Sequence, residues 1–255
     1  MLIALTSGKA GTIGTDIGPG ASWREVFRAS EDLLTASAFG RLTYLEGPVL
    51  WQILRRATGS TLPDFKLVEL ISADFWPRFA EADDSGYTVE PDVLLRFEVG
   101  DPSVRIDFIV EAKLGTSASQ YAEQWRRQWT AFKKINEEGD AATIVYLLAV
   151  GGLGSKKALT VERIVSDLAS TGTLLNVVAA TWGEIADGVH QQLENSVKPS
   201  ERRVLNDVIG ALALANYRHV DILRDLHSAR RFTQAAIDRI SAYDFKETKC
   251  PARII

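Results

Sequence analysis

The sequence predicts an α/β fold in which a mixed central sheet is flanked by helices and followed by a C-terminal helical extension. Apolar residues recur at helical spacing up to about residue 57 and then alternate or cluster as they do in strands. Two of the strand-like segments are joined by a glycine-containing turn, and two later ones each follow a helical segment. A tight turn gives antiparallel strands and a helical crossover gives parallel ones, so the sheet should be mixed.

The segment before the sheet should be helical. Residues 1–21 hold five glycines without clear periodicity, so they should form a leader or a short strand followed by a loop. A helix is expected from about Ser22 to Leu45, with Ser22 or Ser30 capping its segments. Its apolar positions recur at helical spacing: Val26, Leu33, Leu34, Ala38 and Leu42. A short second helix should span Pro48–Ala57.

Five segments rich in β-branched, leucine and aromatic residues are expected to be strands. They are Phe65–Ala73, Tyr87–Glu98, Arg105–Leu114, Thr143–Val150 and Leu174–Thr181. The run Gly100-Asp101-Pro102 predicts a tight hairpin between the second and the third. Helices over Ser119–Glu138 and Leu159–Ser170 should connect the later strands.

Three regions follow from this pattern: the leader 1–21, a core over residues 22–197, and a helical extension over residues 198–255. The extension should form two or three helices, as a separate domain or as a cover on the core. It carries 11 Lys/Arg against 7 Asp/Glu, whereas the whole chain has a net charge of −4. A basic tail suits phosphate contacts and an acidic remainder suits a cation site, but both also suit solvated surfaces.

Composition excludes several functional classes. With 46% hydrophobic residues, the sequence still has no apolar run near the ~20 residues that a membrane span needs. Cys250 is the only cysteine, which excludes an internal disulfide and a cysteine-rich zinc site. No export signal is recognised, so we expect a cytoplasmic protein. The three histidines form no His-x-x-x-His pair, and no Ser/His/Asp assembly can be named.

Two adjoining strand-like segments, Val89–Leu95 and Ile106–Lys113, carry the residues best suited to chemistry. Side chains alternate along a strand, so Glu111 and Lys113 should share one face. If the intervening turn makes a hairpin, Asp92 can lie near Glu111 across the ladder. Two carboxylates and one ammonium group would then converge at the edge of an apolar sheet.

This combination of groups suits a divalent cation. Mg²⁺ prefers oxygen ligands and is usually bound by one or two carboxylates together with waters and substrate phosphate. A cation removes the repulsion between two neighbouring carboxylates. It also lowers the pKa of a bound water and polarises a phosphoryl oxygen. A nearby lysine can orient that water or neutralise charge that develops on phosphorus.

The residues Pro91-Asp92, an apolar hairpin and Glu111-Ala112-Lys113 resemble the motif of the PD-(D/E)XK nuclease superfamily. This superfamily includes restriction endonucleases, Holliday-junction resolvases and repair or phage-defence nucleases, and its core has the order α-β-β-β-α-β. The resemblance implies a restriction-endonuclease-like fold. It covers roughly residues 22–194 and does not explain the C-terminal helices.

The resemblance also implies roles for individual residues. Asp92, Glu111 and the carbonyl of Ala112 would be metal ligands, and Lys113 would be the catalytic lysine. Members often add an acidic residue from the first helix, for which Glu31 is the first match and Asp32 the second. Many also place a glutamine on the helix after the motif. The candidates form an i, i+4, i+8 row, from which we select the second: Gln120, Gln124 and Gln128.

Other features have a plain structural interpretation beside a functional one. Glu90 shares a face with Asp92 and is a reserve ligand if the register differs. Asp107 shares the parity of Glu111, but exposure at the start of its strand is the favoured interpretation. The glycine-rich run 151–157 lacks the order of a phosphate-binding loop and should be a strand-to-helix turn.

The sequence therefore predicts an Mg²⁺- or Mn²⁺-dependent nuclease that acts on nucleic acid, with DNA favoured over RNA. A prokaryotic phage-defence or restriction setting is the expected context. The alternative is a catalytically inactive subunit that binds nucleic acid or a partner protein. The C-terminal helices are candidates for a homodimer interface or for a contact with a protein partner.

Overall fold

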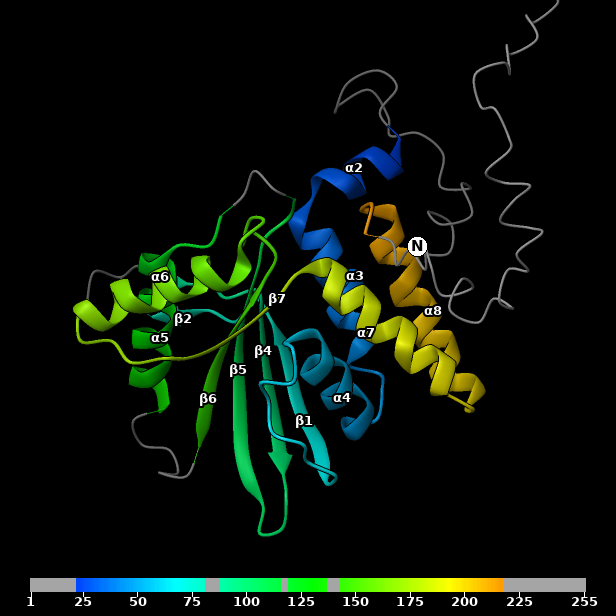
Figure 1. The fold of residues 1–255 in the computed structure, drawn as a ribbon, viewed down its shortest axis with the longest axis horizontal. Coiled ribbons are helices and arrows are strands. Elements are labelled where there is room, and N and C mark those ends of the chain that lie inside the picture. Colours follow the sequence, from blue (N-terminus) through cyan, green and yellow to red (C-terminus); the bar gives the residue numbers. More distant parts are fainter. Residues whose placement is uncertain (1–21, 81–87, 116–118, 137–142, 218–255) are drawn as a thin grey trace, which may run out of the picture. The chain divides into compact units, whose positions relative to one another are not determined.

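The computed structural model describes residues 22–80, 88–115, 119–136 and 143–217, and its fold is shown in Figure 1. Five strands form one twisted sheet in the order β1-β4-β5-β6-β7. Their bounds are Val68–Phe75 (β1), Val93–Val99 (β4), Val104–Ala112 (β5), Ile144–Val150 (β6) and Asn176–Ala180 (β7). The first two pairings in this order are antiparallel and the last two are parallel, which confirms a mixed α/β sheet.

The predicted hairpin sets the register of the central strands. β4 and β5 pair from Val99↔Val104 to Val93↔Val110, and Gly100 adopts a φ of +80° in the turn. Glycine tolerates this left-handed backbone, which other residues adopt only with strain. Because the pairing is antiparallel, the next position beyond Val93 faces the next position beyond Val110.

The predicted strand Tyr87–Glu98 is broken in the structure. Its first part lies in β3 (Thr88–Val89), which pairs with β2 (Phe79–Ala80) in a separate two-stranded sheet. β4 begins only at Val93. Pro91 has no N–H to donate to a ladder, so the backbone leaves the strand there and re-enters the main sheet after Asp92.

The predicted helix over residues 22–45 is two helices, α2 (Trp23–Ala29) and α3 (Glu31–Leu42). Ser30 separates them with an extended backbone, and its hydroxyl accepts a hydrogen bond from Leu33 N at 3.2 Å. A serine that caps a new helix ends the preceding one, because the capping residue has non-helical dihedral angles.

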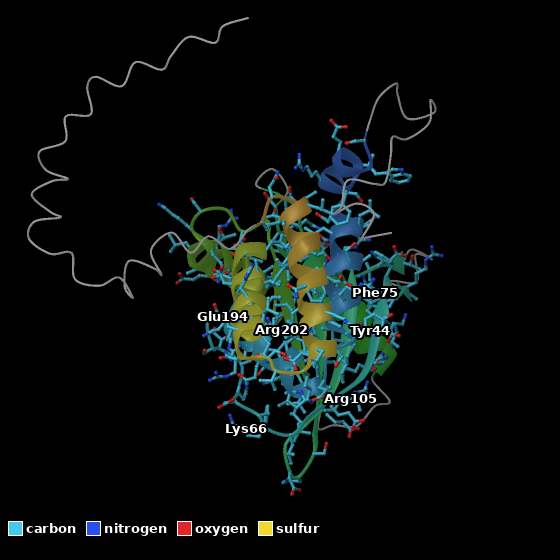
Figure 2. The ribbon with its side chains drawn as sticks, turned by 90° about the vertical axis from the view of Figure 1, so that its right-hand side faces the viewer. Tyr44, Lys66, Phe75, Arg105, Glu194 and Arg202 are labelled. Atoms are coloured by element: carbon cyan, nitrogen blue, oxygen red, sulfur yellow. The ribbon has the colours of Figure 1, made fainter. Side chains whose placement is uncertain are left out.

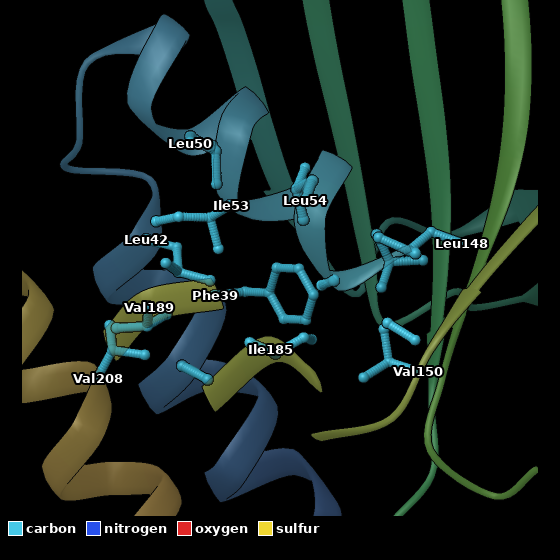
Figure 3. Close-up of a cluster of buried hydrophobic side chains, with 14 of the residues drawn as sticks. Phe39, Leu42, Leu50, Ile53, Leu54, Leu148, Val150, Ile185, Val189 and Val208 are labelled. Carbon is cyan, nitrogen blue, oxygen red and sulfur yellow. The ribbon is translucent and has the colours of Figure 1, made fainter. Parts of the chain in front are cut away.

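Helices cover both faces of the sheet. On one face lie α3, α4 (Gly47–Ala57), α7 (Trp182–Asn195) and α8 (Pro199–Leu214). On the other lie α5 (Ala122–Asn136) and α6 (Lys157–Ser170). Figure 3 shows the main core on the first face, where Phe39 of α3 and Ile185 of α7 approach Val150 of β6. Burial of these apolar side chains holds the helices on the sheet.

The first helix of the C-terminal extension covers the core. α8 packs against α3 and α7, and these three helices lie side by side in Figure 2. Leu205, Val208 and Leu212 of α8 are fully buried. Residues 218–255, the rest of the predicted extension, lie outside the described part of the chain. So does the predicted leader, 1–21.

No helix within the described ranges is long and apolar enough to cross a membrane.

Candidate active site

The end of the β4–β5 hairpin brings Asp92 and Glu111 together. Asp92 N donates to Val110 O at 3.1 Å, which extends the ladder by one position and places Asp92 opposite Glu111. The Asp92 side chain turns back toward β5, where its Oδ2 accepts from Ala112 N at 2.7 Å. Both carboxylates are buried, with 8% of Asp92 and 2% of Glu111 exposed.

Lys113 follows Glu111 on the same face of β5, as the alternation along the strand predicts. Its ammonium group donates to the carboxylates of Glu111 and Glu31, with 3.2 Å to Glu31 Oε1. It also lies 3.0 Å from the carbonyl oxygen of Ala112. Three oxygen atoms from β5 and α3 therefore surround one cationic group.

Glu31 reaches the site because it is the first residue of α3. Ser30 caps this end of the helix, so the helix begins at Glu31. Glu31 Oε2 accepts from Leu114 N at 2.7 Å, while Oε1 contacts the Lys113 ammonium. Asp32, the second candidate, is exposed. The structure thus brings Glu31 to the site and leaves Asp32 outside it.

All three candidate glutamines contact Glu111: Gln120, which precedes α5, and Gln124 and Gln128 of α5. Gln124 Nε2 donates to Glu111 Oε1 at 2.6 Å, and Gln128 Nε2 donates to Glu111 Oε2 at 2.5 Å. Gln120 Nε2 donates to the backbone oxygen of Glu111 at 3.1 Å. The selected Gln124 therefore reaches the site, but so do its two neighbours. The helical spacing of Gln124 and Gln128 was the signal that could have identified both. Gln120 lies before the first residue of α5, because the helix begins at Ala122 and not at the predicted Ser119.

Two contacts that the sequence did not predict hold the backbone of Lys113. Lys113 N donates to Val150 O at 2.7 Å, and Trp182 Nε1 donates to Lys113 O at 3.0 Å. Gly151 lies beside them with a φ of +68°, and a Cβ atom there would come within 2.2 Å of Lys113 O. The glycine-rich run after β6 thus serves as a strand-to-helix turn that leaves room for the end of β5. Lys157, the first residue of α6, pairs with Glu184 at 2.5 Å.

Burial and the repulsion between neighbouring negative charges raise the pKa values of the buried carboxyl groups of the site. Burial, followed by the charge of Glu111, raises the pKa of Asp92 to about 7. Burial also raises the pKa of Glu111, against the opposing effects of Lys113 and Gln128. Burial by itself lowers the pKa of Lys113, but the adjacent Glu111 and Glu31 carboxylates raise it overall. The ammonium of Lys113 therefore stays protonated, while burial favours the protonated form of the Asp92 and Glu111 carboxyl groups in the absence of a cation.

Two weaker candidates lie apart from this cluster. Glu90, the reserve ligand, forms an ion pair with Arg78 at 3.0 Å, and Asp92 occupies the position opposite Glu111 instead. The expected exposure of Asp107 is wrong, because only 1% of its side chain is exposed. Arg105 contacts Asp107 at 3.0 Å and Arg96 contacts it at 3.8 Å, so two guanidinium groups cover this carboxylate.

The donor atoms at the site suit a hard cation. Within the described residues, no three His, Cys, Asp or Glu side chains group in a way that could hold a metal ion. The available set is instead mixed, with the carboxylates of Asp92 and Glu111 and the carbonyl of Ala112, and Glu31 nearby. These are all oxygen donors, which Mg²⁺ and Mn²⁺ accept. The Lys113 ammonium now contacts part of this set.

Comparison with known proteins identifies a relative whose name assigns it no function. The chain is 27% identical over 207 residues to "Uncharacterized protein PM0110" of Pasteurella multocida (strain Pm70). The aligned residues make up 76% of this chain and 73% of that protein. No family model matches the chain. No solved structure matches it either.

Proposed function

We propose that this protein is a metal-dependent nuclease of the PD-(D/E)XK type that hydrolyses phosphodiester bonds, with DNA favoured over RNA as the substrate. One observation carries the proposal. At the end of β5, oxygen atoms of the buried Glu111 and Ala112 and of the partly exposed Glu31 converge on one cationic group beside a second buried carboxylate, Asp92. Such a concentration of acidic groups is costly unless cations offset it.

Asp92, Glu111 and the Ala112 carbonyl would hold Mg²⁺ or Mn²⁺. When bound, the ion lowers the pKa of its water and polarises a phosphoryl oxygen. The hydrogen bond from Ala112 N orients the Asp92 carboxylate. Gln124 and Gln128 donate to separate oxygens of Glu111 and so restrict its rotation. Groups held in this way need little rearrangement when they bind a cation.

Lys113 would serve the reaction through its positive charge. Its backbone is held by Val150 and Trp182, and its ammonium is held by carboxylates on two sides. A cation bound to Glu111 would compete with the ammonium for that carboxylate. Lys113 would then be available to orient a water molecule or to stabilise negative charge on the phosphate.

The order of elements supports the same assignment. α3 supplies Glu31, the antiparallel strands β1, β4 and β5 follow, and α5 leads to the parallel strand β6. This α-β-β-β-α-β order is the one that the resemblance implies. We propose that the protein acts in the cytoplasm of a prokaryote, in phage defence or restriction.

A cleavage assay tests the proposal. Wild type and Lys113→Ala are incubated with supercoiled plasmid and with single-stranded, duplex, branched and RNA substrates, each with Mg²⁺, Mn²⁺ or EDTA. We expect metal-dependent cutting by wild type and a cleavage rate that is roughly 10²–10³-fold lower in Lys113→Ala. Lys66→Ala is the matched control, because Lys66 is an exposed lysine paired with Asp64, and it should cut normally. Equal absence of cutting in wild type and Lys113→Ala would favour an inactive binding subunit.

A further inference from the structure

A cavity of about 430 Å³ lies beside the candidate active site, between α5 and strand β3. Its walls are residues 88–90 and, on α5, Glu123, Gln124, Arg127 and Gln128. Figure 1 shows α5 on the same side of the main sheet as the small β2–β3 sheet, and α5 contacts both of its strands. The volume is within the range of pockets that hold small organic groups.

The cavity and the candidate active site share two residues. Gln124 and Gln128 line the cavity, and the same two side chains donate to Glu111 at 2.6 and 2.5 Å. A group held in the cavity would therefore contact two side chains that also contact the Glu111 carboxylate. On the proposed function, that group would belong to a nucleotide next to the phosphate that is cleaved.

Gln128 contributes a buried acceptor that has no donor. Its Nε2 is used by Glu111, and its Oε1 makes no hydrogen bond within the part of the chain that the structure describes. The residue is only 2% exposed, so bulk water does not satisfy this oxygen. A buried acceptor without a partner is unfavourable, and a ligand that brings an N–H donor relieves the cost.

The charges at the cavity also favour a donor ligand. Glu90 and Glu123 both line it, and each carboxylate also contacts an arginine, at 3.0 Å to Arg78 and 2.6 Å to Arg126. The carboxylate oxygens that line the cavity accept hydrogen bonds, so they can bind an N–H donor but not a phosphate oxygen. A lone metal ion would leave most of the volume unfilled and would lie near the guanidinium of Arg127.

We propose that this cavity binds a nucleobase that carries an exocyclic amino group. The inference rests on the proposed function and specifies its substrate. Carboxylates accept from the N4 amino group of cytosine, and an amide oxygen such as Gln128 Oε1 can accept from the same kind of group. The base must be unstacked to enter, so the substrate is single-stranded or is opened at this position. Thymine has no such amino group and is disfavoured.

The test uses the full-length protein and two fluorescent 12-nucleotide probes, oligo-dC and oligo-dT, with Ca²⁺ as the oxygen-binding ion. Both are pyrimidine strands of equal charge, so the comparison isolates the base edge. Wild type should bind oligo-dC about tenfold more tightly than oligo-dT in fluorescence anisotropy. The variant Glu90→Gln/Glu123→Gln should lose most of this preference. Glu46→Gln, which breaks an exposed ion pair with Lys198, is the matched control and should keep it.

A wild type without a preference for oligo-dC, or a double variant that keeps it, overturns the proposal. Cleavage with Mg²⁺ is measured in parallel, with the ends of the products sequenced. Cleavage without a base preference would support the proposed nuclease activity and contradict the proposed base pocket. A preference that depends on Glu90 and Glu123 without any cleavage would retain the pocket and reject the nuclease.

Discussion

Gln128 on α5 donates its side-chain amide to Glu111 Oε2 at 2.5 Å, and both residues are 2% exposed. This buried bond links the helix after the motif to the central acidic residue of the site. The hydrogen bond from Gln128 also opposes the rise in the pKa of Glu111 that burial causes. Several expected outcomes depend on this arrangement of buried, mutually restrained groups.

Replacing Gln128 with leucine should destabilise the protein by roughly 1–3 kcal/mol, because a buried carboxylate oxygen loses its donor. The measurement is chemical denaturation in EDTA at pH 7. Gln52→Leu is the control, since Gln52 donates to Asp64 at an exposed position, and it should change stability by less than about 0.5 kcal/mol. Equal stability of Gln128→Leu and wild type would mean that this bond contributes nothing.

Without metal, the protein should become less stable as the pH rises from 5 to 8. The pKa of Asp92 is raised to about 7 in the folded state, so folded protein binds a proton that unfolded protein releases near pH 4. The contribution is fully present below that lower value and is lost as the pH rises through about 7. Asp92→Asn should remove roughly 2–3 kcal/mol of this pH dependence. Thermal melts of wild type and Asp92→Asn in EDTA at pH 5 and pH 8 measure this pH dependence. An equal change in stability between the two pH values in both proteins would contradict the prediction.

Mg²⁺ should stabilise the protein more at pH 8 than at pH 5. The ion must displace protons from Asp92 and Glu111, whose pKa values are both raised, and fewer protons are bound at the higher pH. At ten times its dissociation constant, Mg²⁺ would add about 1.4 kcal/mol. The Tm with and without Mg²⁺ gives the result, and Glu111→Gln should show little shift. A shift of equal size in Glu111→Gln would locate the ion elsewhere.

Gly151→Ala should impair both folding and cleavage. The new Cβ would lie 2.2 Å from Lys113 O, on a backbone with a φ of +68°. A contact this close to backbone requires the end of β5 to move, with a cost of at least about 3 kcal/mol. Gly154→Ala is a control in the same turn, because its φ is +64° but nothing lies within 4 Å of its Cβ. It should cost only about 1 kcal/mol. Similar losses in both variants would show that backbone strain alone matters.

Val208→Ala should destabilise the protein by about 2 kcal/mol, because α8 belongs to the core and Val208 is fully buried there. Val197→Ala, just before α8, is the control because Val197 is 88% exposed and should tolerate the change. Urea denaturation compares the two. A neutral Val208→Ala would mean that α8 does not contribute to the stability of the core.

Local patterns predicted the five strands of the main sheet and the central pair of the candidate site, but not the separate β2–β3 sheet. The Gly100-Asp101-Pro102 turn and the apolar segments around it predicted a hairpin that brings Asp92 near Glu111. The structure decided the register, which places Asp92 rather than Glu90 opposite Glu111. Alternation along β5 placed Glu111 and Lys113 on one face. These are relationships between residues that are near in sequence or joined by one turn.

The remaining features were decided by packing between distant segments. Trp182 contacts the Lys113 carbonyl across 69 positions of the chain, and Glu31 reaches Lys113 across 82. The burial of Asp107 depends on Arg96 from the neighbouring strand, and that of Val208 depends on α3 and α7. Backbone propensity and side-chain periodicity act over a few residues, so they determine elements and faces. Which faces pack together depends on the apolar area that the whole chain can bury, so these contacts are seen only in the tertiary structure.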